Sequence, residues 1–175
     1  MSPEYIDIHC HLESKDFSED RMDVIERMKK NNVLGVSVGT DLNTSREVVE
    51  LSDKHPHIFS CIGVHPRDDA RGEFVATEFE KLVSHPKVLA IGECGLDYFR
   101  FEGDIDTEKK RQKALFETQI LFAIQHNKPL MLHCRDAYED SLDILEMHAK
   151  NHGENMKGNA HFFAGNIDIA KRLFD

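Results

Sequence analysis

The sequence has few cysteines and no long apolar run. Its four cysteines are widely spaced and form no C-x-x-C pair, so we expect reduced thiols. Three of them stand next to candidate metal ligands in strand-like segments, and we expect these to pack as small apolar side chains rather than bind metal. No stretch approaches the roughly 20 apolar residues that a membrane helix needs. The N-terminus lacks the basic-then-apolar pattern of a signal peptide. We therefore expect a cytoplasmic protein with no membrane contact.

Positive charge is also scarce, since 22 Lys and Arg stand against 32 Asp and Glu, which gives a net charge of −10. This balance argues against a protein that binds nucleic acid through a broad basic surface. Bound divalent cations could reverse the sign of the field locally, so a nucleic-acid substrate remains possible. The length of 175 residues fits one domain, residues 1–175, with a sizeable core.

Short apolar runs alternate with longer amphipathic ones along the whole chain. Such near-continuous apolar runs are typical of strands buried on both faces, and they predict strands at residues 5–11, 33–40, 58–65, 88–97, 129–135 and 159–164. The amphipathic stretches predict helices at residues 18–31, with Ser18 as the N-cap, and at 44–55, 73–85, 106–127, 137–151 and 167–175. Six alternations without a hairpin signal predict βαβ units and a parallel sheet.

Several predicted strands end in residues that can bind metal. His9 and His11 are two apart, so in a strand both imidazoles project to the same face and could share one ion. Glu93 interrupts an apolar strand, where a carboxylate must be paired, protonated or metal-bound. His133 follows another apolar run, and His161 lies just inside the sixth predicted strand. Taken singly, each residue also fits an ordinary hydrogen-bonded or ion-paired role.

Taken together, the five residues favour a metal centre. Parallel strands place their carboxyl ends on one side, and in barrel enzymes that side holds the active site. Four histidines and a carboxylate suit divalent ions such as zinc, manganese or magnesium. Because five ligands exceed the needs of one tetrahedral ion, we predict two ions, and such pairs activate water for hydrolysis.

Five short segments occur in order along the chain: D-I-H-C-H-L (7–12), G-V-H-P (63–66), I-G-E-C-G-L-D-Y (91–98), L-H-C-R-D-A (132–137) and H-F-F-A-G (161–165). Together they resemble the successive signatures of the TatD family. Proteins of that family are metal-dependent deoxyribonucleases on a (β/α)₈ barrel and are related to the amidohydrolases. The resemblance implies an α/β fold, a parallel TIM-type barrel of which this chain has six of the eight βα units, and DNA as the substrate.

The resemblance also implies roles for individual residues. It assigns His9 and His11 to one metal and His133 and His161 to the second, with Glu93 as the bridging catalytic carboxylate. It places His65 and Arg135 near the substrate phosphate. The alternatives for these last two are a histidine held by backbone and an ion pair between Arg135 and Asp136.

The chain departs from the family pattern at its end. The family has two further strands, and an aspartate after the eighth ligates a metal and helps to activate the water. Asp175 lies in a helical stretch and is not a substitute. A barrel of this type needs about 250 residues, so we expect a missing C-terminal segment or a second chain to complete it. Without that segment we expect unpaired edge strands, an exposed apolar edge and little or no turnover.

Two other functions remain open. An amidohydrolase-like enzyme would act on a small ester, amide or phosphotriester, but those barrels often bridge their metals with a modified lysine where this chain has Glu93. The other is an inactive metal-binding fragment within an assembly.

Overall fold

Six strands alternate with helices in the computed structural model, which describes residues 3–67, 73–101, 103–153 and 156–174. The strands are β1 (Tyr5–Cys10), β2 (Val33–Val38), β3 (Ile58–Ile62), β4 (Val88–Asp97), β5 (Leu130–Arg135) and β6 (Gly158–Ala160). The helices are α1 (Arg21–Lys30), α2 (Leu42–Lys54), α3 (Ala76–Val83), α4 (Ile105–Gln125), α5 (Tyr138–His152) and α6 (Ile167–Phe174), with a short 3-10 helix η1 (Lys15–Phe17) before α1.

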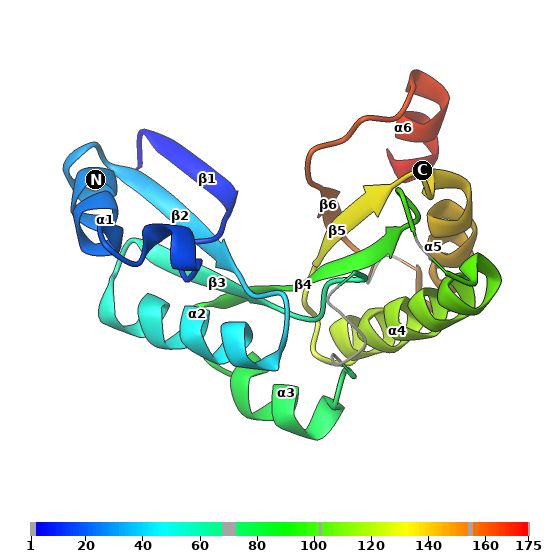
Figure 1. Ribbon diagram of the computed structural model, residues 1–175, viewed down its shortest axis with the longest axis horizontal. Coiled ribbons are helices and arrows are strands. Elements are labelled where there is room, and N and C mark those ends of the chain that lie inside the picture. The colour runs from blue at the N-terminus through cyan, green and yellow to red at the C-terminus, as the bar shows by residue number, and fades with distance from the viewer. Residues whose placement is uncertain (1–2, 68–72, 102, 154–155, 175) are drawn as a thin grey trace.

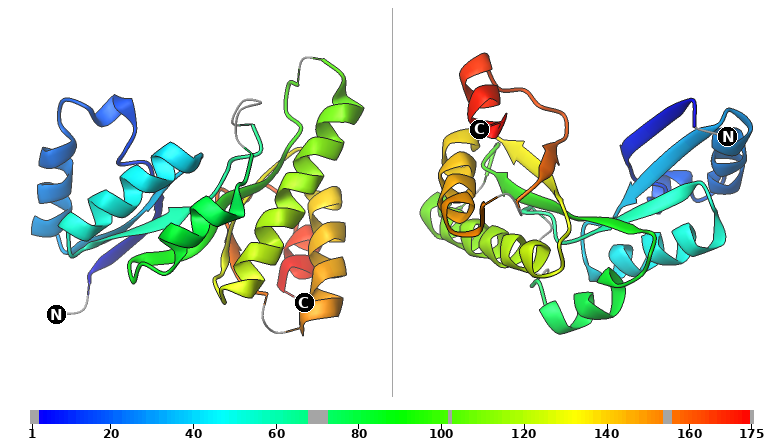
Figure 2. Two further views of the ribbon diagram at one scale, coloured as in Figure 1. Left: turned by 90° about the horizontal axis from the view of Figure 1, so that it is seen from below. Right: turned by 180° about the vertical axis from the view of Figure 1, so that it is seen from behind.

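All six strands form one parallel sheet in chain order, β1-β2-β3-β4-β5-β6. Figure 1 shows that the sheet is strongly curved, with α1 to α5 on its convex side and with β1 and β6 at opposite ends. The two turned views agree on this arrangement (Figure 2). The prediction of a parallel α/β fold with six βα units is confirmed.

Local side-chain chemistry fixes where the helices begin. At α2, Asp41 accepts a hydrogen bond from Thr44 N at 2.6 Å while Thr44 Oγ1 accepts one from Asp41 N at 2.9 Å, which completes a capping box. The prediction of Ser18 as the N-cap of the first helix is wrong. Ser18 is the C-cap residue of η1, and α1 begins only at Arg21, after the N-cap residue Asp20.

Several predicted strands extend too far at their carboxyl ends. His11, His65 and His161 all lie in the segments that follow β1, β3 and β6 rather than in the strands. For the last of these the reason is visible in the next residue, since Phe162 has φ 46°, which extended backbone does not permit. The histidines therefore stand on the loops at the rim of the sheet.

The main core lies between the sheet and its helices. Its largest cluster joins β3, β4 and β5 to α2, α3, α4 and α5, with Phe79, Phe116 and Ile120 fully buried. Cys61 and Cys94 are free and buried, whereas Cys10 and Cys134 are free and partly buried among apolar neighbours. The prediction that the cysteines next to candidate ligands pack as small apolar side chains is confirmed.

Apolar side chains are exposed at both ends of the sheet, on β1 and just after β6. Tyr5, Ile6 and Ile8 of β1 are all more than two-fifths exposed, and Phe162 after β6 is 92% exposed. The expected apolar edge is therefore present. Asp175, which was not expected to replace the missing aspartate ligand, lies outside the described residues. Within the described ranges, no helix has the length and apolar character needed to cross a membrane.

Candidate metal centre

The polar residues at the carboxyl ends of the strands converge on Glu93. Register irregularities fall at Asp7/Cys10 in the β1–β2 pair and at Ile91/Cys94 in the β4–β5 pair. These segments contain His9 and Glu93, and bulges of this kind re-aim side chains next to active sites. The sequence thus supplies both the metal-capable residues and the irregular backbone that turns them inward.

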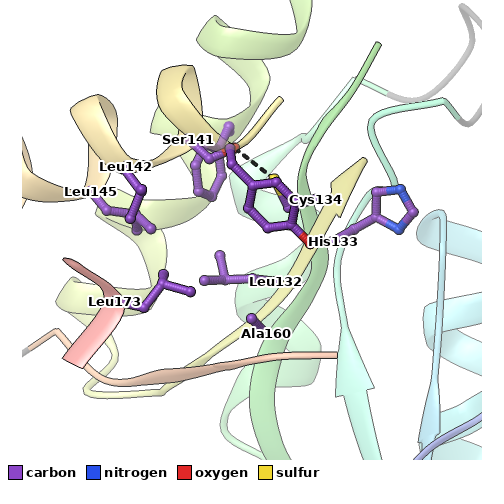
Figure 3. Close-up of a pocket in the computed structure, with 10 residues that line it drawn as sticks. Leu132, His133, Cys134, Ser141, Leu142, Leu145, Ala160 and Leu173 are labelled. Atoms are coloured by element: carbon purple, nitrogen blue, oxygen red, sulfur yellow. Dashed lines mark hydrogen bonds between the residues drawn. The ribbon is translucent and has the colours of Figure 1, made fainter. Parts of the chain in front are cut away.

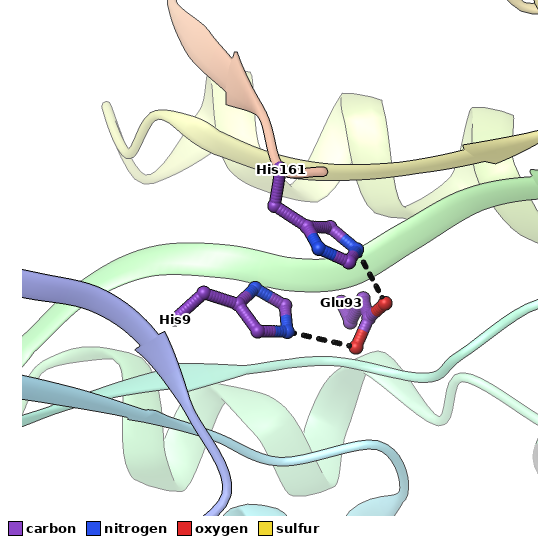
Figure 4. A group of neighbouring side chains, drawn as sticks. All are labelled: His9, Glu93 and His161. Carbon is purple, nitrogen blue, oxygen red and sulfur yellow. Dashed lines mark hydrogen bonds and ion pairs between the residues drawn. The ribbon is translucent and has the colours of Figure 1, made fainter. Parts of the chain in front are cut away.

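Glu93 is the hub of the cluster, and its side chain is 5% exposed. Its Oε1 lies 2.7 Å from His133 Nδ1, 2.7 Å from His161 Nε2 and 3.6 Å from His65 Nε2. Its Oε2 lies 3.3 Å from His9 Nε2 and 3.6 Å from His11 Nε2. Figure 4 shows His9 and His161 approaching this carboxylate from the two opposite ends of the sheet. All four predicted histidines and His65 therefore surround one carboxylate.

Two groups of ligand atoms are compact enough to hold a metal ion among the described residues. In each group three ligand atoms lie within 4.8 Å of one another, and the groups are His9–Glu93–His161 and His65–Asp97–His133. This grouping differs from the expected assignment of His9 with His11 and of His133 with His161. It places His65, expected at the substrate, among potential ligands. The individual ligand roles remain predictions.

The pKa shifts of Glu93 and His65 favour the binding of cations at this centre. Burial by itself would raise the pKa of Glu93, but hydrogen bonds from His133, His161 and His9 hold that pKa well below its usual range. Burial lowers the pKa of His65 to about 4, so this imidazole is neutral at pH 7 and can act as a ligand. The centre therefore combines an ionised carboxylate with a neutral nitrogen donor.

The donor set fits divalent metal better than it fits hydrogen bonding alone. His9 Nε2 lies 3.2 Å from His11 Nε2, and His161 Nε2 lies 3.4 Å from His133 Nδ1, so imidazole nitrogens face one another in pairs. The Nδ1 atom of His9 is buried without a hydrogen-bond partner, and an orphaned buried group is costly. Imidazole and carboxylate ligands together suit first-row divalent ions.

Asp97 and Glu13 are part of the centre, although the sequence did not single them out. Asp97 ends β4, and its Oδ2 lies 2.9 Å from His133 Nε2. Asp97 is four residues after Glu93 in the same strand, so the two side chains are expected on the same face of the sheet. This even spacing could have identified Asp97 from the sequence. Glu13 is buried two residues after His11, and its Oε1 lies 3.2 Å from His11 Nδ1.

Glu13 fixes the orientation of the His11 ring. His11 Nδ1 faces two acceptors, Val38 O at 2.8 Å and Glu13 Oε1, so we assign the proton to Nδ1 and leave Nε2 free toward Glu93. Ser37 Oγ donates to Glu13 Oε2 at 2.9 Å, which holds the carboxylate in place. The hydrogen bond to Glu13 raises the pKa of His11 against the opposing effect of burial.

The Glu13→Gln substitution is expected to lower the pKa of His11, because it removes the negative charge next to Nδ1. We also expect divalent-metal affinity to fall by about 10-fold, as is common when a partner of a metal-binding histidine is lost. An NMR titration of the His11 ring measures the first effect and calorimetry the second. Glu19→Gln, at an exposed position, is the matched control. An unchanged His11 pKa would contradict the assignment.

Arg135 and Arg67 lie beside the second ligand group, around Phe99. The Arg135 guanidinium stacks on the Phe99 ring at 3.6 Å from its centroid, instead of pairing with Asp136 as the alternative proposed. Arg67 donates to Phe99 O, and its guanidinium lies 3.9 Å from Asp97 Oδ1. Two cationic side chains thus stand at the rim of an otherwise acidic molecule, where they can meet an anionic substrate.

A small apolar pocket lies on the other side of the sheet. Its lining includes Leu132, Leu142 and Leu173, from β5, α5 and α6. Figure 3 shows the His133 ring turned away from these side chains. His133 also contributes to the lining, but the pocket is formed mainly by the packing of α5 and α6 on the sheet.

Comparisons with known proteins identify the family of the chain. The family model described as "TatD related DNase" matches residues 6–175. The chain is 37% identical over 142 residues to the "3'-5' ssDNA/RNA exonuclease TatD" of Escherichia fergusonii, a match that covers 80% of this chain and 53% of that protein. It is 36% identical over 168 residues to the "Uncharacterized metal-dependent hydrolase YabD" of Bacillus subtilis, covering 94% of this chain and 63% of that one.

A solved structure shows the same fold. The crystal structure of YJJV, a TatD homologue from Escherichia coli K12, superposes with a TM-score of 0.85 and 28% identity, and the match covers 99% of this chain and 66% of that one. The chain therefore spans about half to two thirds of the length of these relatives. With its parallel sheet, its cluster of histidines on Glu93 and the family match over residues 6–175, this chain belongs to the family of TatD-related DNases.

Proposed function

We propose that the cluster around Glu93 is the centre of a two-metal phosphodiesterase that hydrolyses DNA. The observation that carries this proposal is the convergence of five imidazoles and two carboxylates at the carboxyl ends of parallel strands. Relatives described as metal-dependent hydrolases and as a single-stranded DNA and RNA exonuclease support the reaction class.

Each group of residues has a distinct part in this proposal. His9, Glu93 and His161 would hold one ion, and His65, Asp97 and His133 would hold the other, in the groups that the geometry makes compact. Bound divalent ions supply charge neutralisation for the phosphodiester and activation of a water nucleophile.

The remaining residues would bind the substrate. Arg135 is held flat on Phe99 and Arg67 stands next to Asp97, so both can pair with phosphate oxygens.

The proposal is tested with the purified chain, single-stranded DNA and RNA oligonucleotides, and Mn²⁺, Zn²⁺ or Mg²⁺ with and without chelator. We expect calorimetry to show two divalent ions bound per chain and cleavage that chelator abolishes. Because the relatives are longer and the family resemblance places a further aspartate ligand in their additional length, we expect any such cleavage to be weak, with little or no turnover compared with a full-length relative assayed in parallel.

Three outcomes separate the possible functions. A chain that binds no divalent ion contradicts the proposal, and so does cleavage that resists chelator. Two bound ions without cleavage of DNA, RNA or small esters identify an inactive metal-binding fragment that needs a completing segment or a second chain.

A further inference from the structure

Two glutamines on α4 are fully buried, although their amides are polar. Gln112 and Gln119 both have 0% exposure and lie among apolar residues of the core such as Phe116 and Ile120. Burying an amide is unfavourable unless its hydrogen bonds are satisfied. Glutamine is therefore tolerated at these two positions only because each amide has hydrogen-bond partners.

Each amide binds both backbone groups of a single residue at the rim of the sheet. Gln119 accepts from Val64 N at 2.8 Å and donates to Val64 O at 2.9 Å. Gln112 accepts from Asp97 N at 2.8 Å and donates to Asp97 O at 2.9 Å. This two-point pattern is the one that a neighbouring antiparallel strand would make, so each glutamine replaces a strand partner where the sheet ends.

The two residues that are held flank or belong to the second ligand group. Val64 directly precedes His65, and Asp97 is itself a member of the His65–Asp97–His133 group. The glutamines are seven residues apart, which places them on one face of α4 and about 10 Å apart along its axis. One rigid helix thus sets the spacing between the end of β4 and the loop after β3.

Neighbouring contacts support the same role for α4. A side chain at Gly63 would meet Gln119 Oε1 at 2.7 Å, so the absence of one leaves room for the glutamine. Arg111 donates to Pro66 O at 2.6 Å and pairs with Glu108, and Glu108 also accepts from Gln112 at 2.9 Å. A continuous chain of hydrogen bonds therefore joins the segment around His65 to Asp97 through α4.

We propose that Gln112 and Gln119 are positioning residues that hold His65 and Asp97 at the separation needed to bind one divalent cation with His133. This inference rests on the proposed function, because it concerns the second of the two ions. The His9–Glu93–His161 group takes its residues from β4 and from the segments around β1 and β6, and it receives no such contact from these glutamines. Loss of either amide should therefore weaken the binding of the ion at the His65–Asp97–His133 group more than the binding of the other ion.

The test is a zinc titration of the full chain carrying Gln112→Met or Gln119→Met, two substitutions of similar volume. Calorimetry gives the affinities, and NMR signals of the histidine rings assign each ion to its group. We expect binding that perturbs His65 and His133 to weaken by about 10–100-fold, as for other lost partners of metal ligands. Binding that perturbs His9 and His161 should change less than about twofold. Gln125→Met, at the exposed end of the same helix, is the matched control.

Weaker zinc binding at the His65–Asp97–His133 group alone supports the inference, because general destabilisation of the fold would weaken zinc binding at both groups. Variants that fold and bind both ions as the unmodified chain does would overturn it, as would equal weakening of both. If the variants do not fold, the inference is tested by an NMR zinc titration of the unmodified chain. The side-chain amide signals of Gln112 and Gln119 should shift as zinc reaches His65 and His133 while those of Gln125 do not, and no shift overturns the inference. An unmodified chain that binds no zinc overturns the proposed function and this inference with it.

Discussion

Replacing Glu93 with Gln is expected to reduce divalent-metal affinity by about 100-fold or more. This exceeds the loss that is typical when a residue that only hydrogen-bonds to a metal ligand is replaced. The substitution keeps the shape of the side chain but removes the negative charge that five imidazoles approach. It also turns an NH₂ donor toward nitrogens that must present lone pairs to a metal. Isothermal calorimetry with Mn²⁺ and Zn²⁺ measures the effect, and any chelator-sensitive cleavage should be lost in the same variant.

The matched control is Glu50→Gln, which removes one negative charge from an exposed position on α2. We expect this variant to bind metal as the unmodified chain does. If Glu93→Gln also retained both ions, the carboxylate would be an ordinary ion-pairing partner of the histidines, and its assignment as a metal ligand would be disproved.

Gly95→Ala is expected to be the most damaging single substitution for stability, by roughly 3–5 kcal/mol or by complete loss of folding. Gly95 has φ 137°, and a Cβ built on it would lie 2.1 Å from His133 O. Since Gly95 pairs with His133 in the β4–β5 register, the two strands that carry Glu93, Asp97 and His133 would have to separate. Chemical denaturation followed by circular dichroism measures the loss.

Gly153→Ala separates backbone strain from the steric clash. Gly153 also has a positive φ, of 57°, but a Cβ there would meet nothing within 4 Å. We expect a cost of about 1 kcal/mol for this control. Equal losses in the two variants would show that the close approach of β4 to β5 at Gly95 is unimportant.

Much of the fold could be read from hydrophobic pattern alone. Runs such as Val33–Val38 and Leu130–Leu132 are mostly apolar, as is typical of parallel strands, and the start of each strand was predicted to within one residue. Strand ends were predicted less well, since loop residues at the rim continue the apolar run. Helix starts depended on caps, so α1 was misplaced where η1 precedes it.

The candidate site was predictable in its members more than in its arrangement. His9, Glu93, His133 and His161 stood out because metal-capable residues at successive strand ends are unusual in an apolar context. Their grouping could not be predicted, because it depends on how far the sheet curves and on which nitrogen of each ring faces inward.

The sequence alone determined the parallel α/β architecture and the family, and it predicted five candidate metal ligands, because periodicity and ordered motifs are local properties of the chain. Only the tertiary structure decided that His65 and Asp97 join His133, that Glu13 orients His11, and that Gln112 and Gln119 hold the rim from α4. These contacts join residues on different elements or depend on the course of a loop. The curvature of the sheet and the packing of α4 set such distances, and no short segment of sequence encodes them by itself.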